Sequence, residues 1–291
     1  MERRAVLKAS GALTTIGLTG LAGCTGSLPV VGSSGFDDIE DWLVAPDLLD
    51  TEHYTVTTTS PAEVEEVAEY MSESDWDEYQ QSYVDVDFAN PHPDEVTRYI
   101  EAGRYDVVLG EFDAERVGSS LERDEYSAGR SYEGYQLYEG PNEATAYAVS
   151  DDAVISVYDD PDAVETAQLV VDAAEGEAER YADRDQDFEV LGDELSPGHI
   201  TMAGSHSRIE ETDVERGRFE DQVAFGMTFE IGEDETDITF VTVFIDENAI
   251  IERDIEAYTE EGNDFDDWRE VSYDIDDNVV TIDGTIRTRD L

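Results

Sequence analysis

A stretch of twelve residues, DRDQDFEVLGDE, has the residue types and spacing of a calcium-binding loop. Asp183, Asp185 and Asp187 fill positions one, three and five of such a loop, and Glu194 fills position twelve. Phe188 stands where the loop needs glycine for its sharp turn, and we expect a strand rather than a helix to follow. Because 74 of the 291 residues are acidic, carboxylates occur at this spacing by chance, and the pattern alone does not indicate a bound cation. The stretch therefore predicts a loose cation site at most, and we expect no metal or cofactor.

A cluster of tyrosines with one arginine could recognise a ligand. The stretch YSAGRSYEGYQLYEG contains Tyr126, Arg130, Tyr132, Tyr135 and Tyr138. A tyrosine combines a broad apolar ring with a hydroxyl, so this set predicts an aromatic face for a sugar or a peptide. Interpreted as one strand, it places Tyr132 and Tyr138 on one side and Tyr135 on the other. The alternative is a strand whose tyrosines pack on both faces with their hydroxyls in water.

The histidines and serines indicate no reaction. His199 and His206 are seven residues apart in a predicted strand, so they face opposite sides and should not share a metal. Ser205 directly precedes His206, but nothing in the sequence marks the two as members of a catalytic triad. The G-x-S-x-G, H-E-x-x-H and G-x-G-x-x-G motifs are absent. We therefore assign no catalytic residue.

The only cysteine, Cys24, lies at the end of a segment with the pattern of an export signal. Arg3 and Arg4 precede an uncharged, weakly hydrophobic stretch of about 15 residues, which is typical of twin-arginine signals. The sequence LAGC over 21–24 resembles a lipobox, at which the signal is removed and the cysteine sulfur carries a lipid. We therefore predict a signal peptide over 1–23 and a protein that a lipid holds on the extracellular face of the cell membrane.

The charge of the chain is strongly negative. Without the signal residues Glu2, Arg3, Arg4 and Lys8, the 74 acidic and 17 basic side chains become 73 and 14, a net charge of −59. Such a chain repels itself in dilute buffer, where charges are screened over about 10 Å, and much less at 1 M salt, where the distance is about 3 Å. Nucleic acid is excluded as a partner because the arginines are scattered and greatly outnumbered. Lys8 is the only lysine, so phosphate-binding loops and Schiff bases are excluded as well.

Hydrophobic periodicity predicts an α+β fold, with largely antiparallel sheets and helices packed on one face. After a flexible tether over 24–36, we expect an α+β domain over 37–190 and a second α+β unit, mostly strand, over 191–291. A hairpin, a helix and two further strands occur over 143–205 and again over 223–288, which suggests a duplicated unit. The alternative is one continuous antiparallel sheet.

Two individual elements are predicted between residues 82 and 103. Alternating apolar residues predict a strand over 82–88. The segment 93–103 begins with acidic residues and ends at Gly103, which predicts a short helix.

The acidic composition without lysine, the paired arginines and the lipobox together resemble surface lipoproteins of haloarchaea. The segments YDVVLGEFDAERVGSSLE, YEGYQLY and AYAVSDDAVISV, within residues 100 to 175, are similar to uncharacterised members of that group. The resemblance implies a lipid-anchored, extracellular protein of an extreme halophile and brings no catalytic residue with it. We expect a non-enzymatic module that binds an envelope protein, a sugar or a small molecule. The alternatives are the solute-binding lipoprotein of a transporter and an enzyme that uses carboxylates or a cation.

Overall fold

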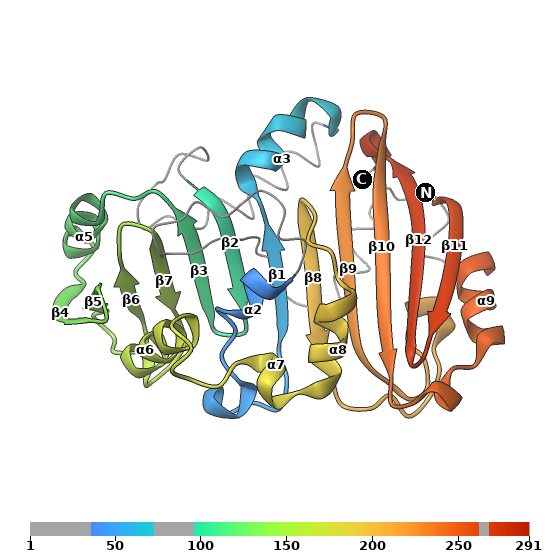
Figure 1. Ribbon diagram of the computed structural model, residues 1–291. Helices are drawn as coiled ribbons and strands as arrows, with labels where there is room; N and C mark the ends of the chain where they lie inside the picture. Colours follow the sequence, from blue (N-terminus) through green and yellow to red (C-terminus); the bar gives the residue numbers. More distant parts are fainter. Residues whose placement is uncertain (1–35, 73–95, 262–267, 291) are drawn as a thin grey trace.

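The computed structural model describes residues 36–72, 96–261 and 268–290 (Figure 1). In this part of the chain, twelve strands form one sheet in the order β11-β12-β10-β9-β8-β1-β2-β3-β7-β6-β5-β4, and every neighbouring pair is antiparallel. The strands are β1 (Thr55–Thr59), β2 (Val96–Ala102), β3 (Tyr105–Gly110), β4 (Ser127–Tyr132), β5 (Tyr135–Glu139), β6 (Ala146–Val149), β7 (Ala153–Val157), β8 (Ile200–Ser205), β9 (Gln222–Ile231), β10 (Glu235–Phe244), β11 (Arg269–Asp276) and β12 (Val279–Arg287). The predicted α+β class and antiparallel sheet are confirmed.

Helices cover both faces of the sheet rather than the single face that we expected. One face carries α2 (Asp37–Glu40), α6 (Ala163–Ala174), α7 (Tyr181–Arg184) and α8 (Gln186–Glu194), and the other carries α3 (Pro61–Val67), α5 (Ala114–Arg123) and α9 (Glu252–Glu261). Short 3-10 helices complete the list: η2 (Pro46–Leu49), η3 (Ala68–Tyr70), η5 (Val214–Arg216), η6 (Glu247–Ala249) and η7 (Thr288–Asp290). Helices lie on both faces because strands of the sheet are apolar on both sides. In β3, Val107 packs toward α6 while Val108 packs toward α5. A strand that is apolar on both sides needs cover on both sides.

The segment 93–103 was wrongly predicted to be a helix. It contains β2, because its β-branched and aromatic residues pair with β1 and β3 and bury their side chains on the sheet. Gly103 has a φ of +65° and makes the turn of the β2–β3 hairpin instead of ending a helix. The strand predicted over 82–88 lies outside the described residues.

The two stretches suggested as a duplication are not equivalent in the sheet. Within 143–205, β8 lies four strands away from β7, whereas β9, β10 and β12 of the second stretch are direct neighbours. The helices α6 and α9 also lie on opposite faces. The strand order thus favours the alternative of one continuous sheet. The domain boundary predicted between residues 190 and 191 falls within α8, and β1 pairs with β8 across it.

Buried tyrosine hydroxyls hold the N-terminal segment against the sheet. Tyr105 of β3 donates a hydrogen bond to the carbonyl of Trp42 (2.9 Å) and accepts one from the backbone N–H of Val44 (3.1 Å). Tyr54 donates to the carbonyl of Val44 (2.6 Å). Burial raises the pKa of Tyr105 to about 12, so its phenol keeps its proton and remains a donor. These bonds fix the chain immediately before β1 and thereby position His53.

Candidate functional site

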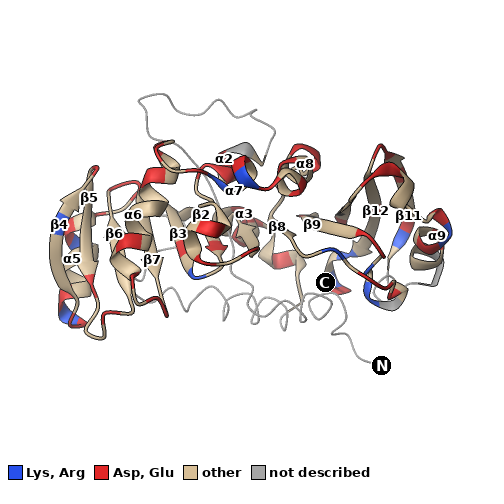
Figure 2. Ribbon diagram, turned by 90° about the horizontal axis from the view of Figure 1, so that it is seen from below, with Lys and Arg blue, Asp and Glu red and all other residues tan. Residues whose placement is uncertain are grey.

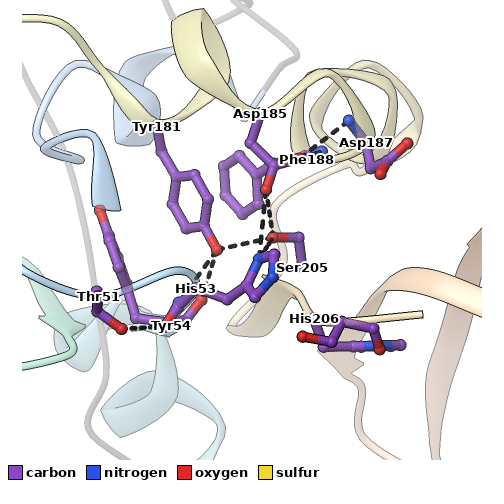
Figure 3. Close-up of polar contacts among 10 residues, drawn as sticks. Thr51, His53, Tyr54, Tyr181, Asp185, Asp187, Phe188, Ser205 and His206 are labelled. Atoms are coloured by element: carbon purple, nitrogen blue, oxygen red, sulfur yellow. Dashed lines mark hydrogen bonds and ion pairs between the residues drawn. The ribbon is translucent and has the colours of Figure 1, made fainter. Parts of the chain in front are cut away.

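Four polar side chains from distant parts of the chain meet beside the N-terminal end of α8 (Figure 3). Ser205 Oγ, at the end of β8, lies 2.9 Å from Nδ1 of His53 and 2.5 Å from Oδ2 of Asp185. The hydroxyl of Tyr181, in α7, lies 3.0 Å from the same serine oxygen. Serine, histidine and aspartate are the residue types of a hydrolytic triad, so the arrangement is the strongest candidate for chemistry in the described part of the chain.

The protons of this cluster can be assigned from the contacts. Ser205 has one hydroxyl proton, and it goes to the Asp185 carboxylate, because a carboxylate can only accept. His53 Nδ1 must then be the donor to Ser205 Oγ. Tyr181 accepts a hydrogen bond from the backbone N–H of Tyr54 (3.1 Å), and its single proton goes either to the Tyr54 carbonyl or to Ser205 Oγ, each at 3.0 Å. The serine thus bonds to both the histidine and the aspartate, with His53 Nδ1 also 3.6 Å from Asp185 Oδ2, whereas in a triad the histidine lies between serine and aspartate.

Local structure positions Asp185 and Tyr181. Asp185 is the N-cap of α8, and its Oδ1 accepts the backbone N–H groups of Asp187 and Phe188, each at 3.1 Å. The ring of Tyr181 stacks on Phe188 with 4.0 Å between centroids and an interplanar angle of 2°, and lies 4.5 Å from the ring of Tyr54. Both residues thus join the start of α8 to β1 and β8.

The arrangement holds elements together rather than presenting a nucleophile. Ser205 is 5% exposed, and its oxygen already accepts from His53 while its proton is held by Asp185. Attack on a substrate would require the serine to become accessible and its oxygen to give up the hydrogen bond from His53. The cluster, which we call the Ser205 network (His53, Tyr181, Asp185 and Ser205), therefore fits a structural role.

Sequence reasoning missed this network because its members are far apart. His53 and Ser205 are separated by 152 positions, and no spacing rule connects them. The histidine adjacent in sequence, His206, is directed elsewhere: its Nδ1 contacts the carbonyl of Ser207 (3.0 Å) and its ring lies near Phe225. Burial lowers the pKa of His206.

The acidic stretch 183–194 does not form a loop. Most of it is α8, and the element that follows is the strand β8, as expected. Asp183 accepts the backbone N–H of Arg180 (3.0 Å), Asp185 caps α8, and Glu194 is exposed at the helix end. Burial raises the pKa of Asp187. Among the described residues, no group of three or more His, Cys, Asp or Glu side chains is placed to hold a metal ion.

The tyrosine stretch is divided between the two faces of the sheet. A turn at Glu133 and Gly134, both with positive φ, breaks it into β4 and β5, so Tyr132 and Tyr135 pair directly and share a face. The parity deduced from a single strand is therefore wrong.

The two sets have different surroundings. On the α6 side, the Tyr132 hydroxyl donates to Asp172 (2.6 Å), and the Arg130 guanidinium lies 5.9 Å from the Tyr132 ring centre and 3.3 Å from Gln168 Oε1. On the α5 side, Tyr138 is 7% exposed and Tyr126 contacts the ring of Tyr147 at 5.1 Å. The five residues do not form one recognition face.

Cys24, Arg3 and Arg4 lie outside the described residues, as does the whole predicted signal. No helix in the described ranges is long and apolar enough to cross a membrane. Acidic residues are spread over helices, loops and strand ends, while basic residues are few (Figure 2).

Comparison with known proteins shows similarity at the level of fold. No family model matches the chain, and no curated protein matches it. The fold is similar to that of TP0453 in crystal form I, with a TM-score of 0.50 and 13% identity over 89% of this chain and 96% of that one. Crystal form III of TP0453 has a TM-score of 0.48, also at 13% identity and the same coverage. At this identity the likeness shows a shared α+β fold alone.

Proposed function

We propose that this chain is a lipid-anchored extracellular protein of an extreme halophile that serves as a non-enzymatic binding module of the cell envelope. The observation that carries the proposal is the lipobox cysteine, twelve positions before the buried Phe36, on a body with 73 acidic side chains. Twelve extended residues reach about 40 Å at most, so a lipid on Cys24 would keep the folded body close to the membrane surface.

The structural role of the Ser205 network argues against a hydrolytic function. Asp185 accepts hydrogen bonds from Ser205 of β8 and from the first turn of α8, so the pair holds α8 against the sheet. The single continuous sheet also differs from the two lobes of repeated βαβ units that are usual in solute receptors of transporters.

The ligand surface that we propose for this module is smaller than the predicted one. We place it on the α6 side of the sheet edge, at Arg130, Tyr132 and Tyr135 with Gln168 of α6, and call it the β4 edge surface. Arg130 is exposed and offers a guanidinium beside an aromatic ring, a combination that suits a sugar or an acidic peptide.

Replacing Cys24 tests the anchor. Cys24→Ser removes the sulfur that would carry the lipid, so the full-length protein expressed in a haloarchaeal host should move from the membrane pellet to the medium. Immunoblots of the two fractions measure the shift, and circular dichroism of the released protein should show an unchanged fold. A variant that stays in the membrane pellet would contradict the anchor.

Replacing Arg130 tests the binding surface. Arg130→Ser should weaken co-sedimentation of the released protein with cell envelopes in molar KCl by about tenfold or more, the effect expected for an interfacial arginine. Arg253→Ser is the matched control, because Arg253 is 81% exposed on α9 and pairs with its neighbour Asp254. Equal binding by the two variants argues against the β4 edge surface. Any catalytic turnover that Ser205→Ala abolishes argues against a non-enzymatic role.

A further inference from the structure

Two carboxyl groups face each other directly across neighbouring strands. Glu101 of β2 and Asp106 of β3 are register partners in the β2–β3 hairpin, so their side chains project from the same face of the sheet. Directly opposed residues in an antiparallel pair have Cβ atoms about 5 Å apart. Like charges at this separation repel, and in a half-buried position water screens them poorly.

The contacts of Asp106 are neutral hydroxyl groups. Tyr158 donates to Oδ1 (3.2 Å), Ser156 donates to Oδ2 (3.4 Å), and the Tyr99 hydroxyl is a third donor. Tyr99 and Ser156 are 6% and 7% exposed, so this side of Asp106 is closed to water. Hydroxyl groups stabilise a carboxylate without neutralising its charge.

Charged and titratable groups reach Asp106 from three strands. Strand β2 contributes Glu101 and Tyr99, β6 contributes Tyr147, and Tyr158 directly follows β7. Arg104, in the turn between β2 and β3, pairs instead with Asp160 at 3.4 Å. Within the described part of the chain, no arginine pairs with Asp106, whereas Asp41 and Asp47 do have arginine partners.

We propose that Glu101 and Asp106 together bind one proton in the folded protein near neutral pH, and that the folded protein therefore loses stability as the pH rises through neutrality. The site is a proton-binding pair built into the β2–β3 hairpin, and it is independent of any membrane anchor or ligand.

The direction of the pH dependence follows from linkage. Burial, and then the charge of Glu101, raises the pKa of Asp106 to about 7, while the three hydroxyl donors oppose the shift. Burial also raises the pKa values of Tyr99 and Tyr158, which therefore keep their protons and remain donors. Between the ordinary pKa of an aspartate and pH 7, the folded chain binds more protons than the unfolded chain, so stability falls as pH rises.

The test compares Asp106→Asn with the unchanged sequence, both carrying Cys24→Ser, by urea unfolding in molar KCl between pH 5 and pH 8. The asparagine keeps the shape of the side chain and cannot ionise. We expect the ratio of the two unfolding constants to change by up to about a hundredfold over this range, since each pH unit contributes up to tenfold. Asp237→Asn on β10, where the side chain is exposed, is the matched control and should leave the pH dependence unchanged.

Two further measurements keep the test decisive if Asp106→Asn does not fold. Glu101→Gln removes the neighbouring charge and should move the fall in stability to lower pH. Infrared spectra of the unchanged protein should show a protonated carboxyl band that disappears between pH 6 and pH 8. Parallel stability profiles for Asp106→Asn and the unchanged protein, or a spectrum without that band at pH 6, would overturn the proposal.

Discussion

In about 2 M KCl the lipid-free Cys24→Ser protein is expected to be folded, and below roughly 0.5 M KCl it is expected to lose its native circular dichroism signal. The cause is the net charge of −59 on the mature chain, which leaves most carboxylates without a cation. Even on paired strands, the exposed Glu230 of β9 and Asp237 of β10 are direct register partners of the same charge. Such repulsion is tolerated only where salt shortens its range.

The measurement is a series of spectra from 0.1 to 3 M KCl, with sucrose of equal osmolality as the control. Sucrose favours compact states by exclusion but does not screen charge, so it should not replace KCl. A native spectrum in dilute buffer would contradict the halophile interpretation, and rescue by sucrose would point to a marginal core instead of charge repulsion.

Tyr181→Ala is expected to be the most destabilising single substitution at the Ser205 network, with a loss of roughly 3–5 kcal/mol in the free energy of unfolding. The ring is fully buried between Tyr54 and Phe188, so its removal leaves a cavity. The same substitution removes the hydroxyl that contacts Ser205 and the backbone of Tyr54. Loss of these bonds leaves buried polar groups without their partner.

Tyr181→Phe separates the two contributions, because the ring remains and only the hydroxyl is lost. We expect a cost of about 1–3 kcal/mol, measured by urea unfolding in molar KCl. Tyr273→Phe is the control, since its hydroxyl makes a long surface contact of 3.5 Å with Glu252, and its effect should stay within about 0.5 kcal/mol. If Tyr181→Phe behaved like the control, the network would not contribute to stability.

Local patterns are enough to account for several elements of the fold. The helix α5 begins after Asp113, which accepts the backbone N–H of Arg116 as an N-cap, and the hairpin β6–β7 follows from two apolar runs joined at Asp151 and Asp152. The failure at β2 has the same origin. Acidic residues before an apolar run and a glycine after it fit a helix as well as a hairpin strand, and only pairing with β1 and β3 decides between them.

Composition and nearby residues determined the charge of this protein, the class of its fold and the pattern of an export signal, because each depends on residue types or on spacings of a few positions. The tertiary structure decided which polar groups meet. It joined His53 to Ser205, gave Asp106 a second carboxyl and three hydroxyls as neighbours, and divided the tyrosine stretch between two faces. The physical reason is that these contacts depend on the order and register of strands, which are set by burial over the whole sheet.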